Sequence, residues 1–179
     1  MKVFFTADCH FDHTNIIKYT GRPFKNIDHM NMEIVKRWNK IVNDDDLVYH
    51  IGDFAFKGIL NGRKWESRLN GSIVHILGNH DRNNGIKTCI TQCMMRFGGK
   101  DVFVQHHPPE VVPICDFVVC GHIHEKWKYK FVDMGIKSII TGDERVPVIN
   151  VGVDVWNFEP VSMLSLLKYY GKLKHGVIK

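Results

Sequence analysis

Five short segments of the sequence combine carboxylate, imidazole or amide side chains that could bind a metal ion. Each segment directly follows a short apolar run of the kind that forms a buried strand. The residues are Asp8 and His10; Asp53; Asn79, His80 and Asp81; His106 and His107; and His122 and His124. Each motif alone is common and could be a polar turn. Five in succession, all at the ends of expected strands, are better explained by one shared site.

The chemistry of this residue set indicates which metals it suits. Imidazoles combined with carboxylates and one amide favour transition metals such as iron, zinc or nickel, with manganese as our first choice. A site for magnesium or calcium alone would consist mostly of oxygen ligands. The set is also larger than one four- to six-coordinate ion can use while keeping an open position. We therefore expect two divalent ions that share a carboxylate, at a separation of roughly 3.5–4 Å.

The elements that carry these residues alternate between strand and helix patterns. The sequence predicts strands at 3–6, 47–51, 73–77, 102–105 and 117–120, and helices over 30–42, over 64–69 and within 86–96. A β-rich run follows at 146–153, with a hairpin expected near 128–140, and the apolar residues after Pro160 form either a helix or a strand. Strands that alternate with helices predict an α/β fold. In such sheets ligands bind at the carboxyl ends of the strands, where the candidate residues lie.

Composition limits the class of protein. The chain has 179 residues, which we expect to form a single domain over 1–179, and its 44% hydrophobic and 24% charged residues argue against disorder. We see neither a secretory signal nor a run of roughly 20 apolar residues, so we expect no membrane association and a cytoplasmic location. The net charge of +5 is compatible with an anionic substrate. The five cysteines are expected to be buried thiols rather than disulfides or a zinc knuckle.

The motifs, taken in order, resemble the signature set of the calcineurin-like metallophosphoesterases, in particular the small prokaryotic and phage members. They are Asp8-x-His10, Gly52-Asp53, Gly78-Asn79-His80-Asp81, a histidine before Pro108, and Gly121-His122-x-His124. The resemblance implies a four-layer α/β/β/α sandwich, with two mixed β-sheets flanked by helices. It also assigns the metal ligands. Asp8, His10 and His124 would hold one ion, Asn79, His106 and His122 the other, and Asp53 would bridge them.

The same resemblance places His80 opposite the substrate and selects His106 rather than His107 as the ligand. The implied reaction is hydrolysis of a phosphodiester or phosphomonoester, in which a hydroxide shared by the two ions attacks phosphorus. His80 then protonates or stabilises the leaving oxygen. Asp81 would orient His80 or cap a helix. The substrate class includes nucleotides.

Two further residues are candidates for substrate binding. His13 either lines the site or belongs to a surface loop, and Arg22 either binds phosphate or lies in a solvated loop before Pro23. A nuclease is the alternative function; it would need a broad basic face, whereas the charges here are scattered. A non-catalytic metal-binding scaffold, as found among relatives in retromer, would be expected to have lost ligands or His80. The sequence leaves the oligomeric state open.

Overall fold

The computed structural model describes residues 1–133 and 145–178; residues 134–144 and 179 lie outside this description. The strands form two sheets. The first has the order β3-β2-β1-β9 and consists of β1 (Val3–Thr6), β2 (Leu47–Ile51), β3 (Ser72–Ile76) and β9 (Val161–Ser162). The second has the order β4-β5-β6-β8-β7 and consists of β4 (Gln92–Phe97), β5 (Lys100–Gln105), β6 (Phe117–Cys120), β7 (Tyr129–Asp133) and β8 (Arg145–Asn150).

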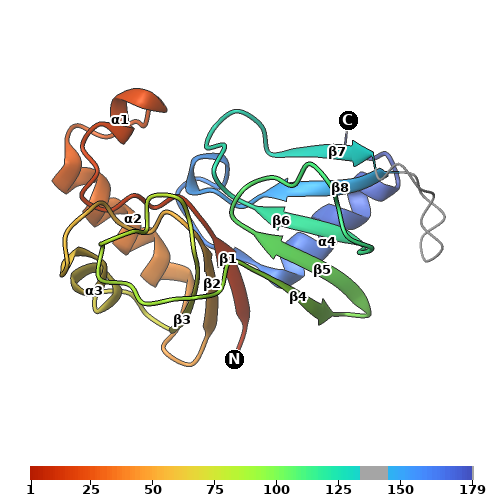
Figure 1. Ribbon diagram of the computed structural model, residues 1–179, viewed down its shortest axis with the longest axis horizontal. Coiled ribbons are helices and arrows are strands. Elements are labelled where there is room, and N and C mark those ends of the chain that lie inside the picture. The colour runs from red at the N-terminus through yellow and green to blue at the C-terminus, as the bar shows by residue number, and fades with distance from the viewer. Residues whose placement is uncertain (134–144, 179) are drawn as a thin grey trace.

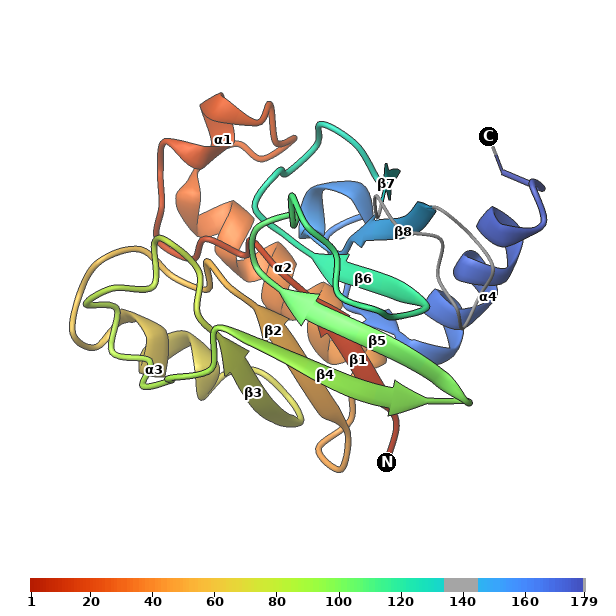
Figure 2. The same ribbon diagram turned by 45° about the vertical axis from the view of Figure 1, so that its right-hand side comes forward.

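Both sheets are mixed. β1, β2 and β3 are parallel and β9 is antiparallel, while β5, β6 and β8 are parallel with antiparallel strands at both edges. The helices are α1 (Ile16–Tyr19), α2 (Ile27–Ile41), α3 (Asn61–Glu66) and α4 (Met163–Lys174), with a 3₁₀ turn at Val153–Val155. Figures 1 and 2 show α2 and α3 beside the first sheet and α4 behind the second. The predicted α/β fold of two mixed sheets flanked by helices is confirmed.

Side-chain alternation along β1 divides the core. Phe4 packs with Val48 of β2 and with Trp38 of α2 in one apolar cluster. Phe5 points to the other face, because successive strand residues alternate, and joins a cluster that contains Val104 and other residues of the second sheet. The first sheet is thus buried on both faces. Such burial explains why its strands read as nearly continuous apolar runs.

Helix α2 follows the expected pattern closely. The side chain of Asn26 accepts a hydrogen bond from the backbone N–H of His29 and so caps the first turn. The buried positions recur at helical spacing, at Met30, Ile34, Val35 and Trp38. The helix ends before Val42, whose backbone is extended.

The helix expected within 86–96 is wrong, because the second half of this stretch belongs to the strand β4 and residues 86–91 form no helix. Cys93, Met95 and Phe97 are partly buried in alternation with exposed residues, which is the period of a strand. Gly98 and Gly99 both have positive φ, 55° and 75°, and join β4 to β5 in a two-residue hairpin. Gly-Gly between two apolar runs was the signal for this hairpin, and the helical interpretation overlooked it.

The bounds of other elements differ by a few residues from those predicted. The short helix expected at 64–69 lies at Asn61–Glu66, and the β-rich run ends as β8 at Asn150 before the 3₁₀ turn. β7 and β8 pair as an antiparallel hairpin, and the remainder of the expected hairpin lies outside the described residues. The segment after Pro160 contains both alternatives, β9 and then α4. Within the described part of the chain, no helix has the length and apolar character needed to cross a bilayer.

Candidate metal centre

The carboxyl ends of five strands from the two sheets converge on one region. β1 leads to Asp8 and His10, β2 to Asp53, β3 to Asn79, β5 to His106 and β6 to His122 and His124. Backbone hydrogen bonds tie the strand ends together, with the Asp8 N–H donating to the Gly52 carbonyl over 3.0 Å and the Gly121 N–H to the His106 carbonyl over 3.0 Å. The structure therefore brings together all seven residues that the sequence predicted as metal ligands.

Five of these seven residues have left-handed backbone conformations. The φ angles are 59° for Asp8, 51° for His10, 59° for Asp53, 73° for His122 and 50° for His124. A residue with a side chain rarely adopts positive φ, and each instance costs on the order of 1–3 kcal/mol. Strain concentrated at one place is typical of a functional site, where the direction of the side chains matters more than local stability.

One group of ligand atoms comes from Asp8, His10 and His124, which lie within 4.8 Å of one another. His10 is 1% exposed, and its Nε2 is buried with no hydrogen-bond partner among the described residues. Burial lowers the pKa of His10 well below its ordinary value, so the imidazole is neutral and keeps a free lone pair. A buried, unpaired nitrogen beside a carboxylate is the environment expected of a metal ligand.

A second group adjoins the first through Asp53. The Asp53 Oδ2 lies 3.5 Å from His10 Nε2 and 3.3 Å from His106 Nε2, so this carboxylate stands between the two groups. The Asn79 Oδ1 lies 3.1 Å from His106 Nε2 and 3.0 Å from His122 Nδ1. Asp8, Asp53 and His106 also place their ligand atoms within 4.8 Å of one another. The geometry is that of two adjacent donor sets with a carboxylate in common.

The protonation of these groups reflects their mutual contacts. Burial raises the pKa of Asp8 to about 6. For Asp53 burial also raises the pKa, but the hydrogen bond and positive charge of His106 outweigh it and hold the pKa below the usual range. Burial lowers the pKa of His106, yet its hydrogen bond to Asp53 and the charge of Asp8 raise the pKa to about 9. These contacts therefore favour the protonated form of His106.

Two of the imidazoles are oriented by hydrogen bonds on the side away from the centre. The Nδ1 of His106 lies 2.8 Å from the Ile51 carbonyl oxygen, to which it donates, which leaves Nε2 directed at Asp53 and Asn79. The Nδ1 of His124 likewise donates to the Asp154 Oδ2 over 3.1 Å. Partners of this kind fix the tautomer and raise the basicity of the ligand nitrogen.

Gly52 allows His106 to approach. Its φ is +81°, and a Cβ at this position would collide with the His106 ring and with the Gly78 backbone. The glycine before Asp53 is therefore required both by the turn and by the close packing of two site segments.

The sequence is similar to that of a known archaeal protein. No family model matches the sequence. The chain is 34% identical over 179 residues to Uncharacterized protein MJ1445 of Methanocaldococcus jannaschii, covering 97% of this chain and 93% of the relative. This chain belongs to the same family as that archaeal protein.

Solved structures bear on the fold alone. A protein of unknown function from Aquifex aeolicus, AQ665, aligns with a TM-score of 0.70 and 22% identity, over 94% of this chain and 98% of that chain. A structure described as a novel archaeal phosphodiesterase aligns with a TM-score of 0.49 and 23% identity, over 85% of this chain and 84% of that chain. The arrangement of two mixed sheets with flanking helices is thus shared with the Aquifex protein.

Arg22 does not have the position that either sequence interpretation gave it. It is 4% exposed, which excludes a solvated loop. Its Nε and Nη2 donate to the two oxygens of Asp154 over 2.7 and 2.9 Å, and its other donors contact the Asp8 and Cys9 carbonyl oxygens and the Met30 sulfur. All five N–H groups are therefore used within the protein, and none is left for substrate phosphate.

Asp154 is the residue that sequence reasoning missed. It is almost fully buried, accepts both hydrogen bonds from Arg22, and also accepts from His124. The signal was present, because Asp154 follows β8 and Gly152 in the same pattern as the residues after the other strands. Arg22 and Asp154 together connect the backbone of Asp8 to the ring of His124.

Asp81 has neither of the roles considered from sequence. Its carboxylate accepts hydrogen bonds from the backbone N–H groups of Asp53, Phe54 and Gly78 over 2.8–2.9 Å, and from the side chain of Asn84. It thus holds the loop after β2 against the loop after β3, and so fixes the segments that carry Asp53 and Asn79.

Three histidines surround the centre at its rim. His80 is exposed, with its ring centroid 5.4 Å from that of His10, and its backbone N–H donates to Asp53 Oδ1 over 2.8 Å. His13 is partly buried, stacks on Phe56 and places its Nδ1 3.3 Å from His10 Nδ1, so it lies at the edge of the site. His107 is exposed, its ring centroid lies 4.0 Å from that of His122, and its ligand atom lies within 4.8 Å of those of His106 and His122, so it too is placed where it could bind a metal ion.

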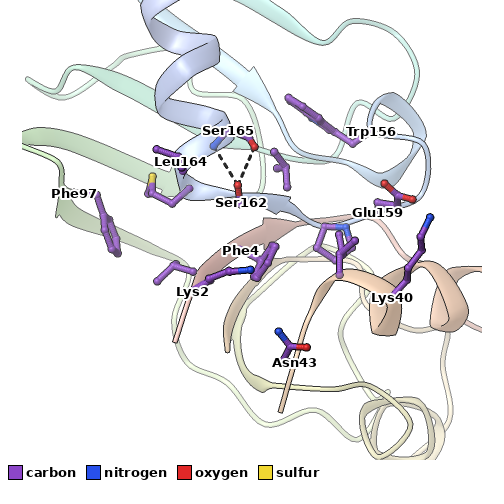
Figure 3. A pocket seen from close by; sticks show the side chains of 15 residues that line it. Lys2, Phe4, Lys40, Asn43, Phe97, Trp156, Glu159, Ser162, Leu164 and Ser165 are labelled. Atoms are coloured by element: carbon purple, nitrogen blue, oxygen red, sulfur yellow. Dashed lines mark hydrogen bonds between the residues drawn. The ribbon is translucent and has the colours of Figure 1, made fainter. Parts of the chain in front are cut away.

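A separate cavity of about 920 Å³ lies at the opposite end of β1. Figure 3 shows it between the start of β1 and the first turn of α4, where Ser162 and Ser165 are joined by hydrogen bonds. Its lining includes Val3 and Phe4, whereas Asp8 lies about 15 Å further along the strand direction. None of the seven predicted ligands is among the described residues that line this cavity.

Proposed function

We propose that this chain is a metal-dependent phosphoesterase of the calcineurin-like type, with two divalent ions, manganese as first choice, at the centre described above. The observation that supports the proposal most directly is the position of Asp53 between two donor groups. One group consists of Asp8, His10 and His124, and the other of Asn79, His106 and His122. A carboxylate in common is what a pair of adjacent cations requires.

The donor set fits this assignment. It combines nitrogen and oxygen ligands and uses no thiolate, as borderline divalent metals prefer. The unpaired, buried Nε2 of His10 would be satisfied by a cation. When bound, the two ions would supply an acidified water as nucleophile and positive charge for the phosphate oxygens.

The side chains of the protein orient the ligands and supply the proton. His106 and His124 are held by the Ile51 carbonyl and by Asp154, so that their Nε2 atoms stay directed inward during turnover. His80 stands exposed at the mouth of the centre and donates a proton to the leaving oxygen of the ester. Its backbone N–H donates a hydrogen bond to Asp53, which ties the segment that carries His80 to the shared carboxylate.

The substrate of this proposal is a phosphodiester or phosphomonoester, with nucleotides included. The test measures hydrolysis of bis-p-nitrophenyl phosphate and of p-nitrophenyl phosphate, with added manganese and with chelator as the control. Chelator-sensitive cleavage is the expected result, and the preferred compound identifies diester or monoester chemistry. Protein that holds two metal ions and hydrolyses neither compound, nor any phosphoester in a wider panel, would contradict the proposal.

The role of His80 is tested separately. His80→Ala should lower kcat by roughly 10²- to 10⁴-fold, the usual contribution of a general acid, with metal content unchanged. His175→Ala is the matched control, because His175 is exposed after the end of α4. A His80→Ala variant that loses metal would show that His80 supports the centre instead.

A further inference from the structure

A pocket of about 490 Å³ opens beside the metal centre, between the segments that follow β3 and β5. Asn79 and His106 of the centre form part of its wall, so the pocket is continuous with the site. Most of its polar lining comes from Arg82, Thr91, Gln105 and His107. No aspartate or glutamate is among the described residues that line it. We call this space the Arg82 pocket.

The Arg82 guanidinium has N–H groups that no described residue accepts. It is exposed and forms no hydrogen bond or ion pair with any described residue, in contrast to the fully engaged Arg22. Its backbone is nevertheless well fixed, because the preceding residue, Asp81, is held by the N–H groups of Asp53, Phe54 and Gly78. An anchored arginine with free N–H groups is suited to bind a phosphate or carboxylate.

The other walls also present donors. The Thr91 hydroxyl forms no hydrogen bond with a described residue, and the exposed His107 ring adjoins the centre through His122. The Gln105 amide donates to the His107 carbonyl over 2.7 Å and so holds that segment in place. Because the described lining contains a guanidinium and neutral donors but no carboxylate, the pocket is suited to anions. Its volume lies within the range of small-molecule sites, which exceeds the space that one phosphate group needs.

We propose that the Arg82 pocket binds a second phosphate group of the substrate whose scissile ester lies at the metal centre, and that Arg82 selects for it. This inference rests on the proposed function. Such a group can come from a small bisphosphorylated metabolite or from the neighbouring phosphate of an oligonucleotide, since both present negatively charged phosphate oxygens to the guanidinium.

The test uses two chromogenic esters that differ only in the second phosphate. They are the p-nitrophenyl ester of thymidine 5′-phosphate and the same compound with a 3′-phosphate. For the wild type, kcat/KM should be roughly tenfold higher for the doubly phosphorylated ester, which is the gain from one charge-assisted contact. In Arg82→Gln this ratio should fall to about one. Arg96→Gln, which removes a charge from exposed Arg96 on β4, should keep the wild-type ratio.

A longer ester with three thymidine nucleotides distinguishes the two sources. A further rise in kcat/KM with length indicates an oligonucleotide, and a plateau after the second phosphate indicates a small bisphosphate. The inference is overturned by a wild-type ratio near one, by an Arg82→Gln variant that keeps the ratio, or by loss of metal from that variant. If metal-loaded protein cleaves neither ester nor any phosphoester of the wider panel, the proposed function fails; if it cleaves both esters equally well, only this inference fails.

Discussion

Asp154 offers a sharp test of the interpretation of the metal centre, because its two oxygens accept three hydrogen bonds from buried groups. Oδ1 accepts from Arg22 Nε over 2.7 Å, and Oδ2 accepts from Arg22 Nη2 over 2.9 Å and from His124 Nδ1 over 3.1 Å. In Asp154→Asn one oxygen becomes an NH₂ group. Whichever way the amide is turned, that group faces a donor, and at least one charged hydrogen bond is lost.

The expected cost follows from burial. The side chains of Arg22 and Asp154 are 0% and 3% exposed. Breaking a buried ion pair by removing one charge costs about 3–5 kcal/mol, since the remaining charge stays desolvated. For a chain of this length, that corresponds to a fall in Tm of about 10 °C. The orientation of His124 would be lost as well, and a partner of this kind typically contributes 10- to 100-fold to metal affinity.

The pH dependence provides an independent check. Burial raises the pKa of Asp154, but the hydrogen bonds from His124 and Arg22 outweigh it and lower the pKa to about 2. A depressed pKa stabilises the folded state above the unfolded pKa, and this contribution is lost as pH falls through the folded pKa. We therefore expect Asp154 to contribute roughly 2 kcal/mol that disappears between about pH 4 and pH 2. The Asn variant should lack this part of the acid transition.

The assay combines urea unfolding of metal-free protein with manganese titration against a competing chelator, at a temperature where both proteins are folded. Glu33→Gln is the matched control, because the ion pairs of Glu33 with described residues are surface pairs with Lys36 and Arg37 on α2. The reasoning is refuted if Asp154→Asn matches the wild type in both stability and metal affinity. A loss of stability with unchanged metal affinity would limit Asp154 to a structural role.

Three further predictions address the centre itself. Asp53→Asn should abolish binding of the second metal ion, as measured by metal content, because the shared ligand loses its charge; two retained ions with full activity would contradict this. Metal binding at pH 7.5 should release about one proton from His106, because the pKa of this residue is raised to about 9. The affinity for metal should therefore increase with pH up to about pH 9. Calorimetry in buffers of different ionisation enthalpy measures the number of protons released. Gly52→Ala should destabilise the protein by at least about 3 kcal/mol in urea unfolding, since its Cβ meets His106 and Gly78, whereas Gly21→Ala, with open space around it, should cost about 1 kcal/mol.

The sequence by itself determined where chemistry is concentrated. Polar residues after successive apolar runs are visible without a structure, because strands in α/β sheets are buried and their carboxyl ends carry the functional loops. The strands at Val3–Thr6, Leu47–Ile51 and Phe117–Cys120 were predicted to the residue, since a buried strand reads as a nearly continuous apolar run. β4 was not, because a half-exposed edge strand is amphipathic and its period is easily mistaken for that of a helix.

Only the tertiary structure decided what each polar residue contacts. Arg22 and Asp154 are separated by 132 positions, and no local pattern shows that they form a buried pair beside His124. The different surroundings of His106 and its neighbour are likewise a matter of space, because His106 enters beside Gly52 and contacts Ile51 and Asn79, while His107 is exposed. Residue type and spacing specify which side chains reach the edge of a sheet; packing between segments distant in sequence specifies which of them are buried there and which remain exposed.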